Sequence, residues 1–84
     1  MKHARDDYNR FQDPLHPSNP HRIPDDEPVF LIRGQDVSGP AALRAWAELN
    51  DVNGGEAEAS KKAREWAERM LEWQAQHGSH PADL

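Results

Sequence analysis

The C-terminal half of the chain repeats apolar residues at a helical period. The repeat consists of Ala59, Ala63, Trp66, Met70 and Trp73, at spacings of 4, 3, 4 and 3. A heptad-like stripe of this kind, widened here by Ala67 and Leu71, is typical of a helix with one apolar face. His77-Gly78 supplies an end signal, because glycine often closes a helix. The pattern predicts a helix over about Glu56–Gln76.

A shorter helical pattern comes before it, within Ala41–Asp51. Its apolar positions are Leu43, Trp46, Ala47 and Leu49. Ser38-Gly39-Pro40 is a good start, since Ser38 or Gly39 can cap the helix and proline suits the first turn. Asn53-Gly54-Gly55 stops it. Two helices joined by a short Gly-Gly turn predict an antiparallel helical hairpin.

The only run of four large apolar residues, Val29 to Ile32, precedes the hairpin. Proline is acceptable at the first residue of a strand and glycine ends the run, so Pro28–Gly34 is expected to be a short strand or an extended segment. A lone strand must pair with a symmetry mate or with the N-terminal arm; otherwise the segment packs on the helices. An apolar run this short leaves these alternatives open.

Proline dominates the N-terminal part, where five of the seven prolines lie in the first 28 residues. Each proline biases the residue before it away from helix, so an extended arm is expected. Residues 1–12 are compatible with a short helix or a disordered tail. The predicted organisation is an arm over residues 1–27, a strand plus helical hairpin over 28–78 and a C-terminal tail over 79–84. The expected fold class is mainly α.

Size and composition bound what this chain can be. A chain of 84 residues with 36% apolar residues has little core material, and domains this small usually need disulfides, metal or oligomerisation. Cysteine is absent, so a homo-oligomer is expected. A formal charge of −5 disfavours DNA or RNA binding through phosphates. No segment is typical of a membrane span or signal peptide, which favours a cytoplasmic protein.

No residue pattern indicates catalysis. The five histidines match no established zinc spacing, and the four serines form no nucleophile elbow. The acidic run Asp25-Asp26-Glu27 has no second cluster to complete a site. We therefore expect no enzymatic activity, no catalytic residue, no metal and no cofactor.

The three tryptophans are expected to form the core, because a small domain needs large side chains. The alternative is an aromatic wall for a flat anionic ligand, with arginines contacting its phosphates. Arg33 and Arg44 flank the turn before the first helix, and a helix N-terminus suits an anion. The candidate ligand-binding residues are Arg33, Arg44, Trp46, Tyr8, Arg10 and Arg22, the last three closing over the ligand from the arm.

The stretch Ile23-Pro24-Asp25-Asp26-Glu27-Pro28-Val29-Phe30-Leu31-Ile32-Arg33-Gly34-Gln35-Asp36, followed by Ala45-Trp46-Ala47-Glu48-Leu49, resembles small accessory proteins encoded by bacteriophages and prophages. The likeness covers residues 20–75. It implies a short, acidic protein of the host cytoplasm that counters host defence by binding. No catalytic residues are assigned in such proteins, so none is carried over.

Two functions follow as hypotheses. The first is a sponge-like protein that sequesters a small nucleotide-like signal of host defence in a pocket between protomers. The second is an acidic inhibitor of a host defence protein, anti-CRISPR-like or antitoxin-like, whose binding would weaken with salt. A helix-turn-helix DNA binder is disfavoured, because the second helix carries Glu65, Glu68 and Glu72.

Overall fold

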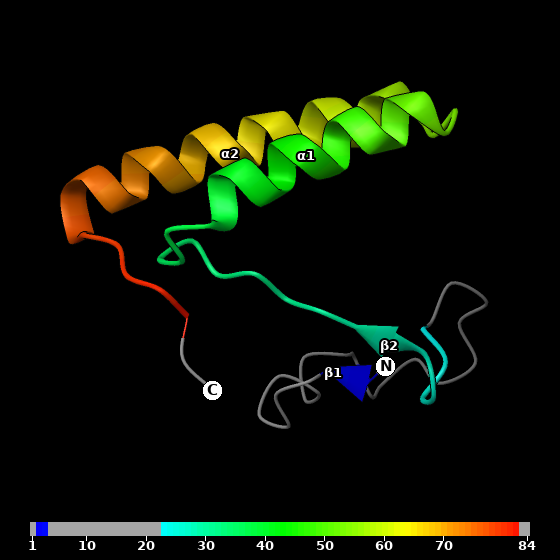
Figure 1. Ribbon diagram of the computed structural model, residues 1–84, viewed down its shortest axis with the longest axis horizontal. Coiled ribbons are helices and arrows are strands. Elements are labelled where there is room, and N and C mark those ends of the chain that lie inside the picture. Colours follow the sequence, from blue (N-terminus) through cyan, green and yellow to red (C-terminus); the bar gives the residue numbers. More distant parts are fainter. Residues whose placement is uncertain (1, 4–22, 83–84) are drawn as a thin grey trace. The chain divides into compact units, whose positions relative to one another are not determined.

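The computed structural model describes residues 2–3 and 23–82. It contains two short strands, β1 (Lys2–His3) and β2 (Pro28–Val29), and two helices, α1 (Gly39–Val52) and α2 (Ala57–His77) (Figure 1). The chain divides into two compact units, of which one ends at Leu31 and the other covers Ile32–Asp83. The strands belong to the first unit and the helices to the second. The described part is mainly helical, as the sequence predicts.

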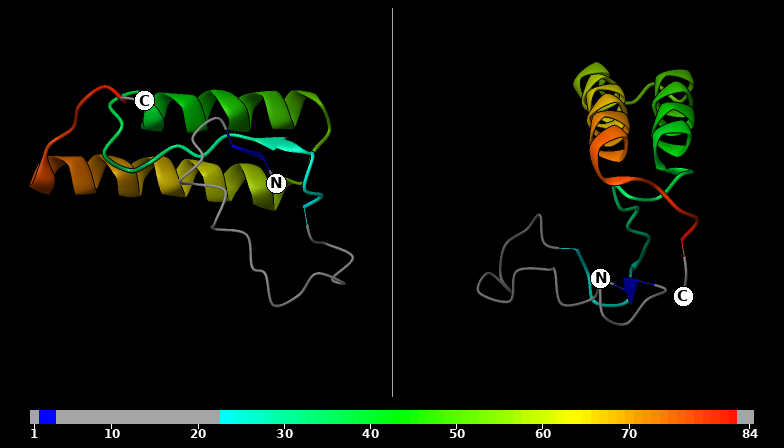
Figure 2. Two further views of the ribbon diagram at one scale, coloured as in Figure 1. Left: turned by 90° about the horizontal axis from the view of Figure 1, so that it is seen from below. Right: turned by 90° about the vertical axis from the view of Figure 1, so that its left-hand side faces the viewer.

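The helical hairpin is confirmed, with its ends within two residues of those predicted. The two helices run side by side along their length in both views of Figure 2. Gly54 takes a φ of 75° after α1, and the amide of Gly55 donates to the carbonyl oxygen of Asn50 at 2.8 Å. Gly78 takes a φ of 87° after α2. Glycine adopts this left-handed region without the penalty that a Cβ brings, so both helices end where glycine permits it.

The start of α1 differs from the prediction in one respect. Pro40 occupies the first turn as expected, but the Ser38 side chain makes no capping hydrogen bond. Instead the Asp36 carboxylate accepts a hydrogen bond from the backbone amide of Ser38 at 2.8 Å. The Asp36 carbonyl oxygen also accepts from the amide of Gly39 at 2.9 Å. Asp36 thereby organises the turn that leads into the helix.

Small side chains fill the seam between the helices. Ala47 and Ala67 are completely buried, and Ala63 and Met70 are nearly so. Ser60, also buried, donates its hydroxyl to the Ala47 carbonyl oxygen at 3.2 Å. Because the distance between packed helices depends on the side chains at the contact, an alanine seam brings the two backbones close together. The core of the hairpin is therefore narrow.

The predicted strand is shorter than expected and ends at Val29. It pairs in parallel with β1, so that Lys2 is opposite Pro28 and His3 opposite Val29. The sequence left three alternatives open for this strand, and the structure shows the one in which it pairs with the N-terminal arm. The C-terminal tail is attached to the segment before α1 at His80, whose backbone amide donates to the Gln35 carbonyl oxygen at 3.1 Å.

Gln74 of α2 holds the segment that leads into α1. Its side-chain amide donates to the carbonyl oxygens of Gly34 and Asp36, at 2.9 Å in each case. We expect Gln74→Ala to lower the free energy of unfolding by about 1–2 kcal/mol, because it leaves two partly buried carbonyls without a donor. Urea denaturation followed by circular dichroism measures this. Gln76→Ala, at an exposed position of the same helix, is the control. Equal losses of unfolding free energy in the two variants would mean that the Gln74 hydrogen bonds do not hold this segment.

Candidate functional site: the tryptophan face

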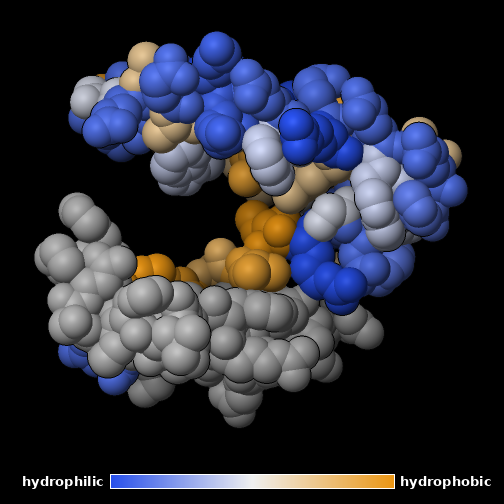
Figure 3. All heavy atoms as spheres, turned by 180° about the vertical axis from the view of Figure 1, so that it is seen from behind, coloured by the Kyte–Doolittle hydropathy of each residue, from blue (hydrophilic) through white to orange (hydrophobic). Residues whose placement is uncertain are grey.

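One side of the hairpin carries ion pairs between the helices. Arg44 of α1 pairs with Glu68 of α2, and Arg64 Nη2 lies 2.7 Å from Asp51 Oδ2. We call this side, with the neighbouring Glu48, the ion-pair face. Exposed pairs of this kind contribute at most about 1 kcal/mol each. The hydrophilic atoms along the top of the hairpin in Figure 3 lie on this side.

On the ion-pair face, the Asp51 carboxyl has a lowered pKa. The Ser60 hydroxyl and the Arg64 guanidinium lower the pKa of the Asp51 carboxyl from its ordinary value of 3.8. Both groups favour the charged form, Ser60 as a neighbouring hydroxyl and Arg64 as hydrogen-bond donor and positive charge. Asp51 therefore remains a carboxylate paired with α2, and it is not a candidate for acid catalysis at neutral pH.

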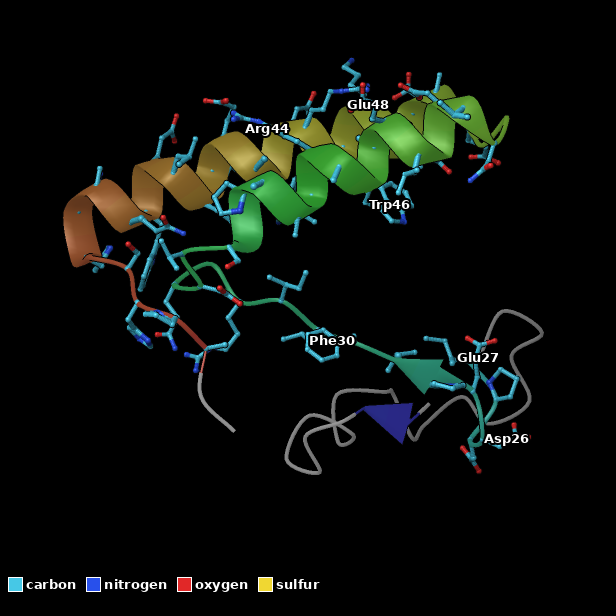
Figure 4. The ribbon with its side chains drawn as sticks, viewed as in Figure 1. Asp26, Glu27, Phe30, Arg44, Trp46 and Glu48 are labelled. Atoms are coloured by element: carbon cyan, nitrogen blue, oxygen red, sulfur yellow. The ribbon has the colours of Figure 1, made fainter. Side chains whose placement is uncertain are left out.

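The three tryptophans lie on the opposite side of the hairpin. Trp46 follows Arg44 by two positions, and Trp66 lies two positions from both Arg64 and Glu68. Two positions correspond to about 200° around a helix, so such residues point in nearly opposite directions. Figure 4 shows Trp46 on the other side of α1 from Arg44 and Glu48. Trp73 shares the side of Trp66, because seven residues are almost two full turns.

We call the surface formed by Trp46, Trp66 and Trp73 the tryptophan face. The expectation that these residues form the core is wrong, since their exposed fractions are 48%, 42% and 42%. The reason is the alanine seam: helices that meet on Ala47 and Ala67 leave no space for an indole between them. The indoles flank the seam instead of filling it.

Contacts between the helices fix which tryptophans are neighbours. Residue 44 pairs with 68 and residue 51 with 64. In an antiparallel hairpin these pairs place Trp46 of α1 at the level of Trp66 of α2, on the same side of the seam. Trp73 lies two turns further along α2, toward the start of α1. The face therefore extends along the hairpin as well as across it.

Basic side chains accompany the indoles. Lys62 Nζ lies 5.3 Å and Arg69 Cζ 4.4 Å from the centre of the Trp66 ring. Cations at these distances are attracted to the negative face of the indole. The Trp73 ring stacks on His77 with centroids 4.3 Å apart. The tryptophan face thus combines flat aromatic surface with positive charge in a chain whose net charge is −5.

Two of the residues predicted to bind a ligand, Arg44 and Trp46, do not come together in one protomer. Arg44 and Trp46 point to opposite sides of α1, and Arg44 pairs with Glu68. Arg33 is exposed in the segment before α1. The other three predicted residues, Tyr8, Arg10 and Arg22, lie outside the described part of the chain. One small ligand therefore cannot contact both Arg44 and Trp46 of the same chain.

Sequence reasoning missed the pairing of Lys62 and Arg69 with Trp66. The signal was present, because residues 62, 66, 69 and 73 are spaced by 4, 3 and 4 and such spacing places side chains on one side of a helix.

Within residues 23–82 no group of three or more histidines and carboxylates is placed to hold a metal ion. Neither described helix is long and apolar enough to cross a membrane.

Comparisons with protein families, with curated proteins and with solved structures gave no match for this chain. The feature of the molecule that bears on function is therefore the geometry of the tryptophan face.

Proposed function

We propose that this chain is a non-enzymatic protein-binding module that acts through its tryptophan face. The observation that carries the proposal is the presence of three half-exposed tryptophans on one side of a hairpin whose seam is made of alanine. Tryptophan is enriched among the residues that dominate binding energy at protein interfaces. A soluble monomer seldom leaves so much contiguous apolar surface in water without a use for it.

The amount of exposed aromatic surface agrees with this function. With exposed fractions of 42–48%, each indole leaves about 100 Å² in water, which is on the order of 300 Å² for the three. A standard interface covers about 800 Å² on each partner. The tryptophans alone would supply more than a third of that area. Two helices side by side are also a common platform for a further amphipathic helix.

A second candidate function is the capture of a nucleotide-like ligand. Trp66 with Lys62 and Arg69 supports it, because an aromatic ring and two cations suit a base and its phosphates. In this form the binding residues are on α2, and Arg44, which lies on the ion-pair face, would have to come from another protomer. We rank it second because the formal charge of −5 on the chain opposes the approach of an anion.

A displayed library of helical peptides, each about 20 residues long, tests the first function. We expect enriched peptides to carry apolar residues at positions i, i+3 or i+4 and i+7. Their affinity should fall about tenfold or more in Trp66→Ala, since aromatic anchors dominate such contacts. Glu72→Ala, at an exposed position of the same helix, is the matched control and should bind as the unmodified chain does.

The outcomes separate the two functions. Peptides that bind Trp66→Ala as well as the unmodified chain, or a library without enrichment, would contradict the protein-binding function. Equilibrium dialysis against a panel of linear and cyclic nucleotides tests the second. A nucleotide that is depleted by the protein, released intact on heating and lost in Arg69→Ala would favour sequestration.

A further inference from the structure

Helix α1 is apolar on two sides. Leu43 and Ala47 face the seam with α2, as expected for one helix of a hairpin. A second stripe on the side away from α2 consists of Ala42, Ala45, Trp46, Leu49 and Val52, which we call the outer stripe. Leu49 is 61% exposed and Val52 79% exposed. A helix that packed on α2 alone would carry polar residues at these positions.

The outer stripe is complementary to itself. When two copies of α1 lie antiparallel with full overlap, residue 39 is opposite residue 52, because α1 spans Gly39–Val52. The same register places Trp46 opposite Ala45 and Leu49 opposite Ala42 of the other copy. Each large side chain then faces a small one, which is the arrangement that allows helices to interdigitate at close distance. A two-fold axis repeats every such contact.

The charges on α1 permit this contact. Its two carboxylates, Glu48 and Asp51, and its one cation, Arg44, all lie on the ion-pair face. Two chains with a formal charge of −5 each can therefore meet along the outer stripe without opposing carboxylates at the contact. The narrow alanine core gives a reason for the association, because a domain of this size needs further apolar burial.

We propose that the partner of this surface is a second copy of the chain, with the two α1 helices packed antiparallel across a two-fold axis near residues 45 and 46. The inference rests on the proposed function, since it names the protein that the aromatic surface binds. Trp46 belongs both to the outer stripe and to the tryptophan face, so the contact continues from α1 toward Trp66 of α2. Each copy contributes the alanines that receive the other copy's Trp46 and Leu49.

Because the chain contains no cysteine, a single introduced thiol can be cross-linked without competing thiols. In the full chain, Ala45→Cys places a single thiol beside the two-fold axis, whereas Glu48→Cys places one on the ion-pair face. Under mild oxidation at micromolar concentration, Ala45→Cys should become mostly disulfide-linked dimer and Glu48→Cys should remain mostly monomeric. Equal cross-linking of the two variants, or none in either, would overturn the proposed contact.

Sedimentation equilibrium of the unmodified chain is the second measurement, and it needs no variant to fold. We expect a mass of twice 9.6 kDa that falls toward 9.6 kDa on dilution. A single-chain mass at every concentration overturns the dimer. If peptide binding then still depends on Trp66, the protein-binding function stands with a different partner. If that dependence is absent too, both proposals fail.

Discussion

Ala67→Leu should lower the free energy of unfolding by about 2–3 kcal/mol, the largest loss that we expect from a single apolar substitution in this chain. Ala67 is completely buried where α2 meets α1, and Ala47 on the facing helix is completely buried too. Three additional carbon atoms at this point force the helices apart. The separation weakens the dispersion contacts along the seam and lengthens two hydrogen bonds: the one that Ser60 donates to the Ala47 carbonyl and the one that it accepts from the Asn50 side-chain amide.

Ala75→Leu is the matched control, because it makes the same substitution at an exposed position of the same helix. It should change the free energy of unfolding by no more than about 0.5 kcal/mol. Urea denaturation followed by circular dichroism, at one fixed protein concentration, measures both variants. Equal losses in the two would mean that the alanine seam does not hold the hairpin together.

The helices were predictable because their ends depend on local chemistry. Gly54 and Gly78 adopt positive φ values after α1 and α2, and Pro40 lies in the first turn of α1. Each of these effects acts within a few residues of the chain, so the sequence carries it directly. The helix ends were accordingly predicted to within two residues.

The burial of the tryptophans was not predictable in the same way. Helical spacing shows which residues share a side, but not which side meets the neighbouring helix. On α2 the stripe through Ala59, Trp66 and Trp73 competes with a second one through Ser60, Ala67 and Gln74. The two differ by one position, and both have the spacing of a helix. The second lies inward although its ends are polar, because Ser60 and Gln74 find hydrogen-bond partners there.

The candidate site shows a further limit of sequence reasoning. The sequence places Arg44, beside the turn before α1, and Trp46, from the aromatic wall, in one candidate site, although residues two positions apart on a helix point in nearly opposite directions. That part of the error could have been avoided once the helix was predicted. The contacts of Gln74 with Gly34 and of His80 with Gln35 could not have been foreseen. They join residues 40 and 45 positions apart and depend on the packed arrangement.

A single substitution at either side of the contact between Leu49 and Ala42 should weaken self-association, whereas exchanging the two residues should restore it. Leu49→Ala alone removes a side chain that enters the space above Ala42 of the other copy, and Ala42→Leu alone places two leucines against each other. Each variant should weaken the dimer by about tenfold or more. The double variant Ala42→Leu/Leu49→Ala again pairs one leucine with one alanine at each contact. It should therefore return to within a few-fold of the unmodified dissociation constant.

Recovery in the double variant is the informative result, because independent effects would instead multiply to about a hundredfold loss. Sedimentation equilibrium over a concentration series gives all four dissociation constants. Leu49→Ala combined with Ala75→Leu has the same composition as the double variant, but position 75 is on α2. This control should stay as weak as Leu49→Ala alone. If it recovers equally, total hydrophobicity explains the association and the antiparallel register of α1 is wrong.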